Sequence, residues 1–151
     1  MLKSIPAIIT PEVLYSLAAM GHGDQLAIVD RNYPALARNQ RVHALSGVGT
    51  TQAAEAICEL FPIDDFVQPA AYRMTPDGEP FETFEVHREF AEVLRRAEGR
   101  PIDVQAVQRT RFYALAAAAY AVVQTSEPRP FACFIVTKGV VRSAEGATAL
   151  K

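Results

Sequence analysis

The sequence predicts a single α/β domain, a three-layer α/β/α arrangement in which helices cover both faces of a mostly parallel or mixed sheet. Short apolar runs such as residues 26–29 alternate with helix-like segments of about ten to fifteen residues. A length of 151 residues suits one domain, and 50% hydrophobic with 21% charged residues is ordinary for a globular protein. We expect the domain to cover residues 1–142 and residues 143–151 to form a flexible tail.

The first part of the chain contains a clear helix start. Thr10 supplies a capping hydroxyl, Pro11 suits the first helical position, and Glu12 places a carboxylate near the positive end of the helix dipole. We expect this helix to end at Gly21, because glycine readily takes the left-handed conformation of a helix C-cap. The expected elements that follow are a buried strand at 26–29, a loop at 31–40, a strand at 41–45 and a helix at 51–61.

The alternation continues in the second part of the chain. Pro69 interrupts an irregular strand expected at 66–74, and the proline and glycine of residues 75–80 predict a turn. The remaining expected elements are a turn at 62–65, a helix at 83–97 that stops before Gly99, a strand at 102–107, an alanine-rich helix at 109–119, and strands at 120–124 and 132–137.

The composition argues against several kinds of partner. Seventeen acidic and fifteen basic residues give a formal net charge of −2, so we expect no nucleic-acid binding. No apolar run approaches the roughly 18 residues that span a bilayer, and residues 1–6 lack the apolar centre of a secretion signal, which predicts a cytoplasmic protein without a membrane segment. Cys58 and Cys133 are expected to be reduced thiols, and the histidine and cysteine spacings predict no metal site.

The stretch from Met20 to Asp30 concentrates the chemically active side chains. His22 lies between two glycines, which favour a sharp turn and leave the imidazole unshielded by neighbouring side chains. Histidine is the side chain whose ordinary pKa, about 6.5, lies nearest working pH, so His22 suits proton transfer. We expect structural roles for His43, in a strand, and for His87, on a charged helix face.

Several segments distributed over residues 1–140 form a recognisable set. They are Leu2-Lys3, Ile9-Thr10-Pro11-Glu12-Val13-Leu14, Ala19-Met20-Gly21-His22-Gly23-Asp24, Asp30, Leu60-Phe61-Pro62-Ile63-Asp64, Arg109-Thr110-Arg111-Phe112-Tyr113 and Lys138-Gly139-Val140. With these segments the chain resembles the fucose mutarotase and D-ribose pyranase family of sugar mutarotases, and more the fucose branch. The position of Gly-His-Gly-Asp after a capped helix makes the resemblance specific.

The resemblance implies roles for particular residues. It implies that His22 is the proton donor and that Tyr113 takes part in catalysis, while Asp30, Asp64 and Arg109 hold the sugar. It also implies that no cofactor is needed and that the chain forms a ring-like homo-oligomer with sites near subunit interfaces. The chain departs from the family at Phe131-Ala132-Cys133, where Tyr-Gly-Asn or Tyr-Ala-Asn is usual.

This departure bears on the substrate. On an extended strand residues 131 and 133 share a face, so a phenol and an amide are missing from one wall of the expected pocket, although the backbone at Ala132 remains available to a sugar. Each lost hydrogen bond is worth on the order of 1 kcal/mol. A more apolar pocket suits a deoxy sugar or a different pyranose.

The spacing of these residues poses a geometric question. If residues 26–29 are extended, His22 and Asp30 lie at opposite ends of a strand and are roughly 20 Å apart. Arg109 and Tyr113 are four residues apart on one helix and share a face. We therefore expect the partner of His22 to come from Arg109 and Tyr113 or from another subunit.

The leading interpretation is a cytoplasmic, cofactor-independent isomerase, a mutarotase of carbohydrate metabolism that acts on L-fucose or a related monosaccharide. One alternative is a protein that binds or senses a monosaccharide without turnover, because the phenol at position 131 is absent. Another is a structural ring subunit whose pocket Phe131 blocks.

Overall fold

A mixed six-stranded sheet in the order β2-β5-β1-β6-β3-β4 forms the centre of the computed structural model, which describes residues 1–78 and 82–143. Strand β6 runs antiparallel to its neighbours β1 and β3, whereas the other pairs are parallel. The strands are β1 (Gln25–Val29), β2 (Val42–Leu45), β3 (Ala71–Thr75), β4 (Val104–Gln108), β5 (Ala121–Thr125) and β6 (Phe134–Thr137). The helices are α1 (Pro11–Ala19), α2 (Ala35–Arg38), α3 (Thr50–Cys58), α4 (Glu85–Glu98) and α5 (Arg109–Ala117).

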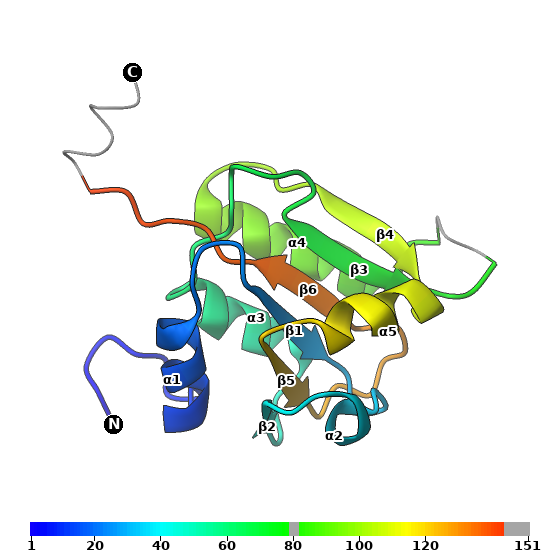
Figure 1. Cartoon of the computed structure of the whole chain (residues 1–151), viewed down its shortest axis with the longest axis horizontal. Helices are drawn as coiled ribbons and strands as arrows, with labels where there is room; N and C mark the ends of the chain where they lie inside the picture. Colours follow the sequence, from blue (N-terminus) through cyan, green and yellow to red (C-terminus); the bar gives the residue numbers. More distant parts are fainter. Residues whose placement is uncertain (79–81, 144–151) are drawn as a thin grey trace.

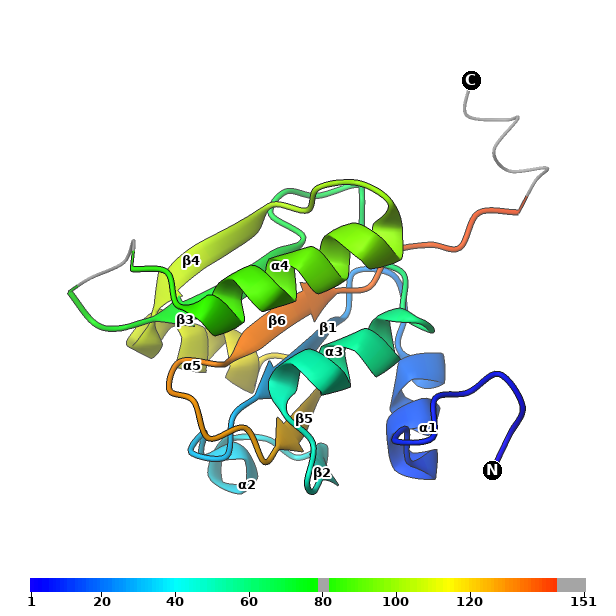
Figure 2. The same ribbon diagram turned by 180° about the vertical axis from the view of Figure 1, so that it is seen from behind.

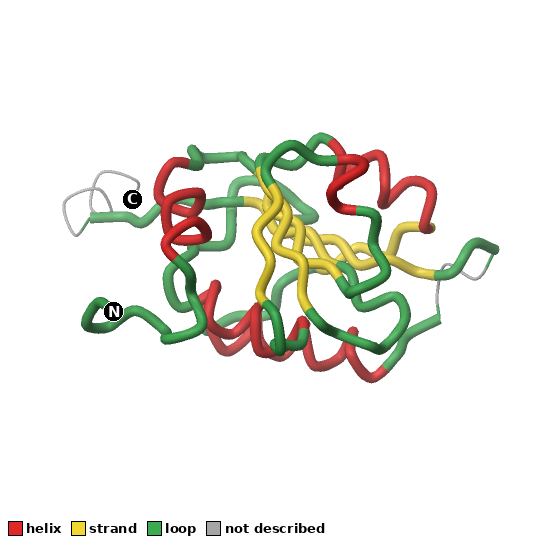
Figure 3. The backbone as a smooth tube through the Cα atoms, turned by 90° about the horizontal axis from the view of Figure 1, so that it is seen from below, coloured by secondary structure: helices red, strands yellow, loops and turns green. Residues whose placement is uncertain are grey.

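Helices lie on both sides of the sheet, which confirms the predicted three-layer α/β/α class (Figures 1 and 3). Alternation along β1 separates two cores: Leu26 and Ile28 face α1, α3 and α4, whereas Ala27 and Val29 face α2 and α5. Figure 2 shows α3 and α4 in front of the sheet on the first of these faces. Because both faces of the sheet are covered, residues 26–29 of β1 are all apolar and buried, as this run predicts.

The first helix begins as predicted but ends earlier. Thr10 Oγ1 accepts a hydrogen bond from the Val13 N–H at 3.3 Å. The helix stops at Ala19 with Met20 extended, so the predicted left-handed cap at Gly21 is wrong. The Lys138 ammonium donates to the carbonyls of Leu17 and Met20, which satisfies the end of the helix from a distant part of the chain.

Several other boundaries differ from the sequence expectation. The predicted loop at 31–40 contains the short helix α2, and the predicted strand at 66–74 begins only at Ala71 and continues through Thr75. Strand β6 begins at Phe134, two residues later than expected. The limits of β3 and β6 follow their ladder pairing, because β3 pairs with β4 and β6 from Ala71 and β6 pairs with β1 from Phe134. α4 stops before Gly99, as expected, and Gly99 takes the left-handed conformation.

The two ends of the described chain bear on the predicted domain limits. Of the expected tail at 143–151, all but Ser143 lies outside the described residues, as do residues 79–81 of the expected turn and its flank. Within the ranges that the structure describes, no helix has the length and apolar character needed to cross a bilayer.

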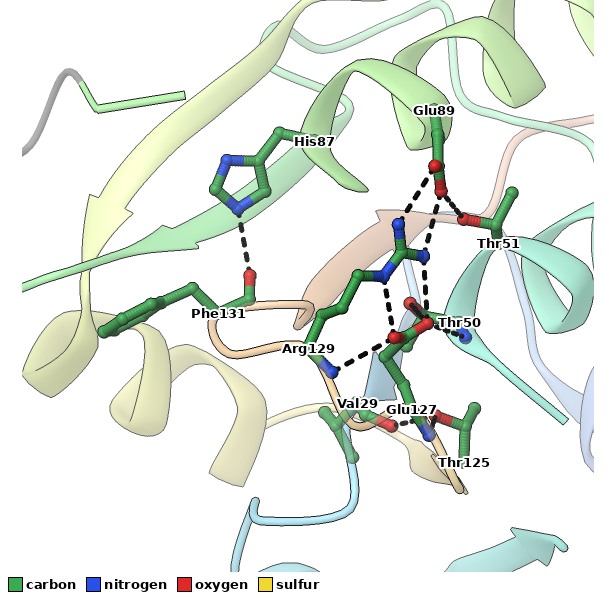
Figure 4. A network of polar contacts seen from close by, with 9 residues as sticks. All are labelled: Val29, Thr50, Thr51, His87, Glu89, Thr125, Glu127, Arg129 and Phe131. Atoms are coloured by element: carbon green, nitrogen blue, oxygen red, sulfur yellow. Dashed lines mark hydrogen bonds and ion pairs between the residues drawn. The ribbon is translucent and has the colours of Figure 1, made fainter. Parts of the chain in front are cut away.

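A carboxylate from another part of the chain occupies the N-terminus of α3. Glu127 Oε2 accepts hydrogen bonds from the Thr50 backbone N–H and from Thr50 Oγ1, each at 3.2 Å (Figure 4). A side chain at Gly49 would bring its Cβ to 2.9 Å from the same carboxylate oxygen, so a larger residue there would displace the Glu127 carboxylate. The Glu127 carboxylate therefore occupies the N-terminus of α3, just after the Gly-Val-Gly segment of residues 47–49, where the helix dipole favours a negative charge.

We expect Glu127→Gln to destabilise the fold in a pH-dependent way. Hydrogen bonds from Arg129, opposed by burial and aided by backbone N–H groups, lower the pKa of Glu127 from 4.5 to about 2. A lowered carboxyl pKa stabilises the fold above the unfolded value of 4.5, and this stability is lost as pH falls toward 2. Because Arg129 is partly exposed, we expect a loss of roughly 2 kcal/mol at neutral pH.

The measurement is the free energy of unfolding in urea near neutral pH and again near pH 3. The difference between the variant and the unmodified chain should shrink at the lower pH. A difference that is equal at both pH values would contradict the expectation.

Candidate functional site

The residues that the sequence nominates fall into two groups at opposite edges of the sheet. His22 precedes β1 and Asp64 pairs near the end of β6, so both lie at the amino edge of the parallel strands. Asp30 follows β1, and Arg109 follows β4, so both lie at the carboxyl edge. Figure 1 shows the α1–β1 loop at the start of β1 and α5 beside its far end. The five residues of β1 span roughly 17 Å between the groups.

At the amino edge, His22 and Asp64 form a close pair. Nε2 of His22 lies 2.9 Å from Oδ1 of Asp64, whose side chain is only 1% exposed, whereas the His22 side chain is 46% exposed. A carboxylate only accepts, so Nε2 donates and Nδ1 carries the lone pair. Nδ1 has no hydrogen-bond partner in the part of the chain that the structure describes. The imidazole therefore offers a proton-accepting nitrogen to solvent, and the Asp64 carboxylate fixes the orientation of the ring.

The loop that carries His22 is fixed by its own residues and by β6. Asp24 Oδ2 accepts from the Gly21 N–H at 2.8 Å, and Gly23 takes a φ of 87°, which favours glycine. The Gly23 N–H donates to the Lys138 carbonyl at 2.9 Å. A Cβ at Gly139 would lie 2.8 Å from the Asp64 backbone, so glycine there allows Asp64 to reach His22. Gly21, Gly23 and Asp24 thus fix the loop that carries His22, and Lys138 and Gly139 hold this loop and Asp64 close together.

An apolar ring lies beside His22 at the surface. The Phe66 ring lies 5.1 Å from the imidazole, centroid to centroid, and the Arg142 guanidinium lies 5.2 Å from the Phe66 ring. Arg142 also forms a bidentate ion pair with Asp65. Phe66, Val67 and Val141 remain 59%, 48% and 80% exposed in the single chain. His22 therefore sits beside apolar surface that one copy of the chain leaves uncovered.

At the carboxyl edge, Asp30 is buried and accepts from the chain that follows it. Its Oδ1 accepts from the Asn32 N–H at 2.9 Å and from the Tyr33 N–H at 3.1 Å. Burial raises the pKa of Asp30, and the hydrogen bonds from Asn32, Cys133 and Tyr33 oppose the rise only in part. The carboxyl is thus held in position in a setting that disfavours its charge.

Tyr113 and Arg109 lie together on α5, as the four-residue spacing predicts. The Arg109 guanidinium is 5.5 Å from the Tyr113 ring, and Arg38 approaches the same ring at 4.7 Å. Tyr33 contacts it edge-on at 5.2 Å. Arg109 also forms an exposed ion pair with Asp77 at 2.8 Å. These groups present a phenol and cations beside Asp30 but lie at the edge remote from His22, so they do not complete its site within one chain.

The expectation of an extended segment at 131–133 is wrong. Phe131 has a φ of 58°, in the left-handed region, and its ring stacks on Phe84 at 5.7 Å. Cys133 is fully buried, and its Sγ accepts a hydrogen bond from the Asp30 N–H at 3.5 Å, so this side chain packs against Asp30 from the core. Burial raises the pKa of the Cys133 thiol well above its usual range. Pairing between β6 and β1 starts at Phe134. Phe131 therefore lies outside the ladder, and no strand pairing holds it in an extended conformation.

His87 does not lie on a charged helix face as expected. It is 2% exposed, and its Nε2 lies 2.9 Å from the Phe131 carbonyl oxygen. Its spacing relative to Phe90 and Leu94, both fully buried, is the helical spacing of a core face, and this signal could have placed His87 inside. A buried histidine bonded to the loop at 131–133 is therefore a part of the carboxyl-edge site that the sequence reading missed.

We expect Asp30→Asn to preserve or raise the free energy of unfolding. The amide oxygen keeps the acceptor for the Asn32 and Tyr33 N–H groups, and the variant loses the buried charge. A raised carboxyl pKa destabilises the fold as pH rises above the unfolded value of 3.8, so the advantage of the variant should grow from acid toward neutral pH. Urea unfolding near pH 4 and pH 7 measures it. A variant less stable than the unmodified chain at neutral pH would be the contrary result.

Neither edge carries the donor set of a metal site. Among the described residues, no group of three or more His, Cys, Asp and Glu side chains could hold a metal ion. Cys58 and Cys133 are buried free thiols in separate parts of the core. The chemistry available at both edges is proton transfer and hydrogen bonding.

Comparison with known proteins places the chain. The sequence profile of the RbsD / FucU transport protein family matches residues 3–141. The chain belongs to this family. It is 39% identical over 147 residues to a protein of Homo sapiens named fucose mutarotase, covering 93% of this chain and 94% of that protein.

Solved structures of the RbsD / FucU family have the same fold. FucU from Bifidobacterium longum has a TM-score of 0.87 and 34% identity, with 93% of this chain and all of that chain covered. The fucose mutarotase of Streptococcus pneumoniae, solved with L-fucose, has a TM-score of 0.83 and 29% identity over the same shares. The resemblance stated from the sequence is confirmed at the level of family and fold.

Proposed function

We propose that the chain is a cofactor-independent mutarotase that interconverts the anomers of L-fucose or a related monosaccharide. The observation that carries the proposal is the half-exposed His22 paired with the buried Asp64 in a family whose relatives are named for fucose mutarotation. The enzyme class is therefore an isomerase acting on carbohydrates.

The reaction needs only proton transfer. A proton reaches the ring oxygen while the anomeric hydroxyl loses one, the bond between the anomeric carbon and the ring oxygen breaks, and an open-chain aldehyde forms. Rotation and reversal of both transfers close the ring as the other anomer and restore the protonation state of the protein. His22 donates and accepts the proton at one of these oxygens, and Asp64 orients the ring, since its burial leaves it to act through His22.

The carboxyl edge supplies the remaining groups. Asp30 accepts from sugar hydroxyls, Arg109 donates to sugar oxygens, and the Tyr113 phenol takes part in proton transfer at the second oxygen. The segment from Phe131 through Ala132 to Cys133 forms the adjoining wall, with Phe131 giving an apolar surface that suits the methyl group of a deoxy sugar.

Two copies of the chain bring these groups together in our proposal. A ring-like homo-oligomer would set the His22 edge of one copy against the carboxyl edge of the next and would cover the apolar side chains of Phe66 and Val67. Leu36, 83% exposed in α2, lies on the carboxyl-edge side. Light scattering after size-exclusion chromatography tests this, and a strict monomer would contradict a shared site.

The test of the function is exchange NMR at the anomeric protons of L-fucose, with D-ribose as a comparison sugar. The expected result is faster exchange on addition of the protein. Calorimetric binding of L-fucose without faster exchange would instead support a binding protein, and neither binding nor exchange would support a structural subunit. A cytoplasmic location and the absence of nucleic-acid binding remain predictions from composition.

A further inference from the structure

The loop between β5 and β6, residues 126–133, is held by hydrogen bonds and ion pairs to α3 and α4. It carries the Phe131–Cys133 segment that the proposed function assigns to the sugar site. Figure 4 shows two attachments: His87 reaches the Phe131 carbonyl, and Arg129 lies between Glu89 and Glu127. Both His87 and Glu89 belong to α4, so one helix holds both attachments.

The partners of His87 define its protonation. Nδ1 lies 3.1 Å from the Phe84 N–H nitrogen and 2.8 Å from Arg73 Nη1, and both of these groups are donors. Nδ1 must therefore accept, so the neutral ring carries its proton on Nε2 and donates it to the Phe131 carbonyl at 2.9 Å. Three polar contacts fix one orientation of the imidazole.

The residue that His87 holds has a backbone conformation that L residues disfavour. Phe131 has a φ of 58°, and because it is not a glycine its Cβ crowds the backbone in this conformation. Such a conformation persists only where tertiary contacts over-determine it. Here the contacts are the His87 hydrogen bond to the carbonyl and the stacking of the ring on Phe84 at 5.7 Å with 7° between the ring planes.

Arg129 provides the second attachment. Its guanidinium donates to both oxygens of Glu89 at 2.9 and 3.0 Å, and its Nε donates to Glu127 at 2.8 Å. Glu127 in turn caps α3 through Thr50. The loop is thus fixed on both sides of its turn, at residues 127–129 and at residue 131.

We propose that His87 is a positioning residue of the sugar site: its neutral imidazole holds Phe131 in the left-handed turn and thereby sets the wall formed by residues 131–133. The inference rests on the proposed function. His87 contacts the loop backbone and lies 2% exposed, so it acts through Phe131.

Protonation would break this arrangement. The charged groups that face His87 are Arg73 from β3 and Arg88 from α4 itself, and burial together with these cations lowers its pKa. An imidazolium would turn Nδ1 into a donor that faces the donors of Phe84 and Arg73. Nε2 would still donate, but the ring orientation that Nδ1 fixes is kept above the ordinary histidine pKa of 6.5 and is lost only as pH falls through the lowered pKa of His87.

The experiment compares His87→Phe, which fills the space without hydrogen bonds, with His87→Gln, which can donate to the Phe131 carbonyl and accept from Phe84. The readout is KM and kcat for L-fucose anomer exchange. For His87→Phe we expect KM to rise on the order of tenfold with kcat changed much less, because the wall binds the ground state and the transition state alike. His87→Gln should restore most of the loss.

The pH profile separates positioning from general stability. KM of the unmodified chain should rise on the acid side, whereas KM of His87→Gln should stay level, since glutamine does not titrate there. Equal acid-side profiles for the two proteins, or an unchanged KM in a folded His87→Phe variant, would overturn the proposal.

Arg129→Gln provides a variant that leaves the core filled if His87→Phe does not fold. It removes the second attachment, and we expect KM to rise in the same direction. The matched control is Arg95→Gln. It breaks the exposed ion pair between Arg95 and Glu92, which both belong to α4 and lie away from the loop. An Arg129→Gln variant with the KM of the control would count against the loop as a positioned wall.

The unmodified chain separates the two proposals. If it exchanges no L-fucose anomers but binds the sugar, the mutarotase function fails, and the same variants are compared by their calorimetric Kd. A Kd that weakens in His87→Phe and recovers in His87→Gln then still supports positioning by His87. A Kd that is equal in all variants overturns it.

Discussion

His22→Gln is expected to lower the rate of L-fucose anomer exchange by about 10²-fold to 10⁴-fold, the usual contribution of a general acid or base. Glutamine can keep a hydrogen bond to Asp64 through its amide but cannot carry a proton between the sugar oxygens. Because the His22 side chain is 46% exposed, the free energy of unfolding should change little. Exchange NMR measures the rate, and urea unfolding checks the fold.

His43→Gln is the matched control for this prediction. His43 is a second half-buried histidine with one side-chain partner, Ser16 Oγ at 2.7 Å, and lies away from both groups of candidate residues. The control should retain exchange. If His22→Gln exchanged L-fucose as fast as the control, His22 would not be the proton-transfer group and the mechanism would fail.

Mixed oligomers of His22→Gln and Tyr113→Phe subunits are expected to recover activity that neither variant has alone. In the proposed ring each site takes His22 from one copy and Tyr113 from another, so random mixing leaves roughly a quarter of the sites with both residues intact. The two variants carry different tags, are co-expressed, and are purified through both tags before exchange is measured.

The control for recovery pairs two variants from the same edge. His22 and Asp64 lie 2.9 Å apart in one chain, so a mixture of His22→Gln and Asp64→Asn restores no intact amino edge. This mixture should stay as inactive as its parts. Recovery in the control, or its absence from the His22 and Tyr113 mixture, would contradict a site shared between copies.

Local patterns in the sequence were sufficient for the elements and for part of the site. The Thr10 cap, the stop of α4 at Gly99 and the apolar run of β1 each depend on neighbours within a few residues, and each was predicted. The pairing of Arg109 with Tyr113 on α5 follows from helical spacing alone. The distance between His22 and Asp30 follows from strand geometry, which identified the problem that a shared site would resolve.

Features that depend on residues distant in the sequence were not predictable in this way. The Lys138 contacts that end α1, the capping of α3 by Glu127 and the left-handed Phe131 held by His87 join segments separated by 44 to 121 residues. A helix pattern could show that His87 points inward, but no local rule gives its partner.

The α/β class, the family resemblance and the identity of the candidate groups could be read from the amino-acid sequence, because they reside in residue types and short spacings. The contact between His22 and Asp64, the place of Cys133 against Asp30 and the separation of the candidate groups at opposite edges of the sheet became visible only in the folded chain. The physical reason is that strand order and direction, and not distance along the chain, fix which side chains meet.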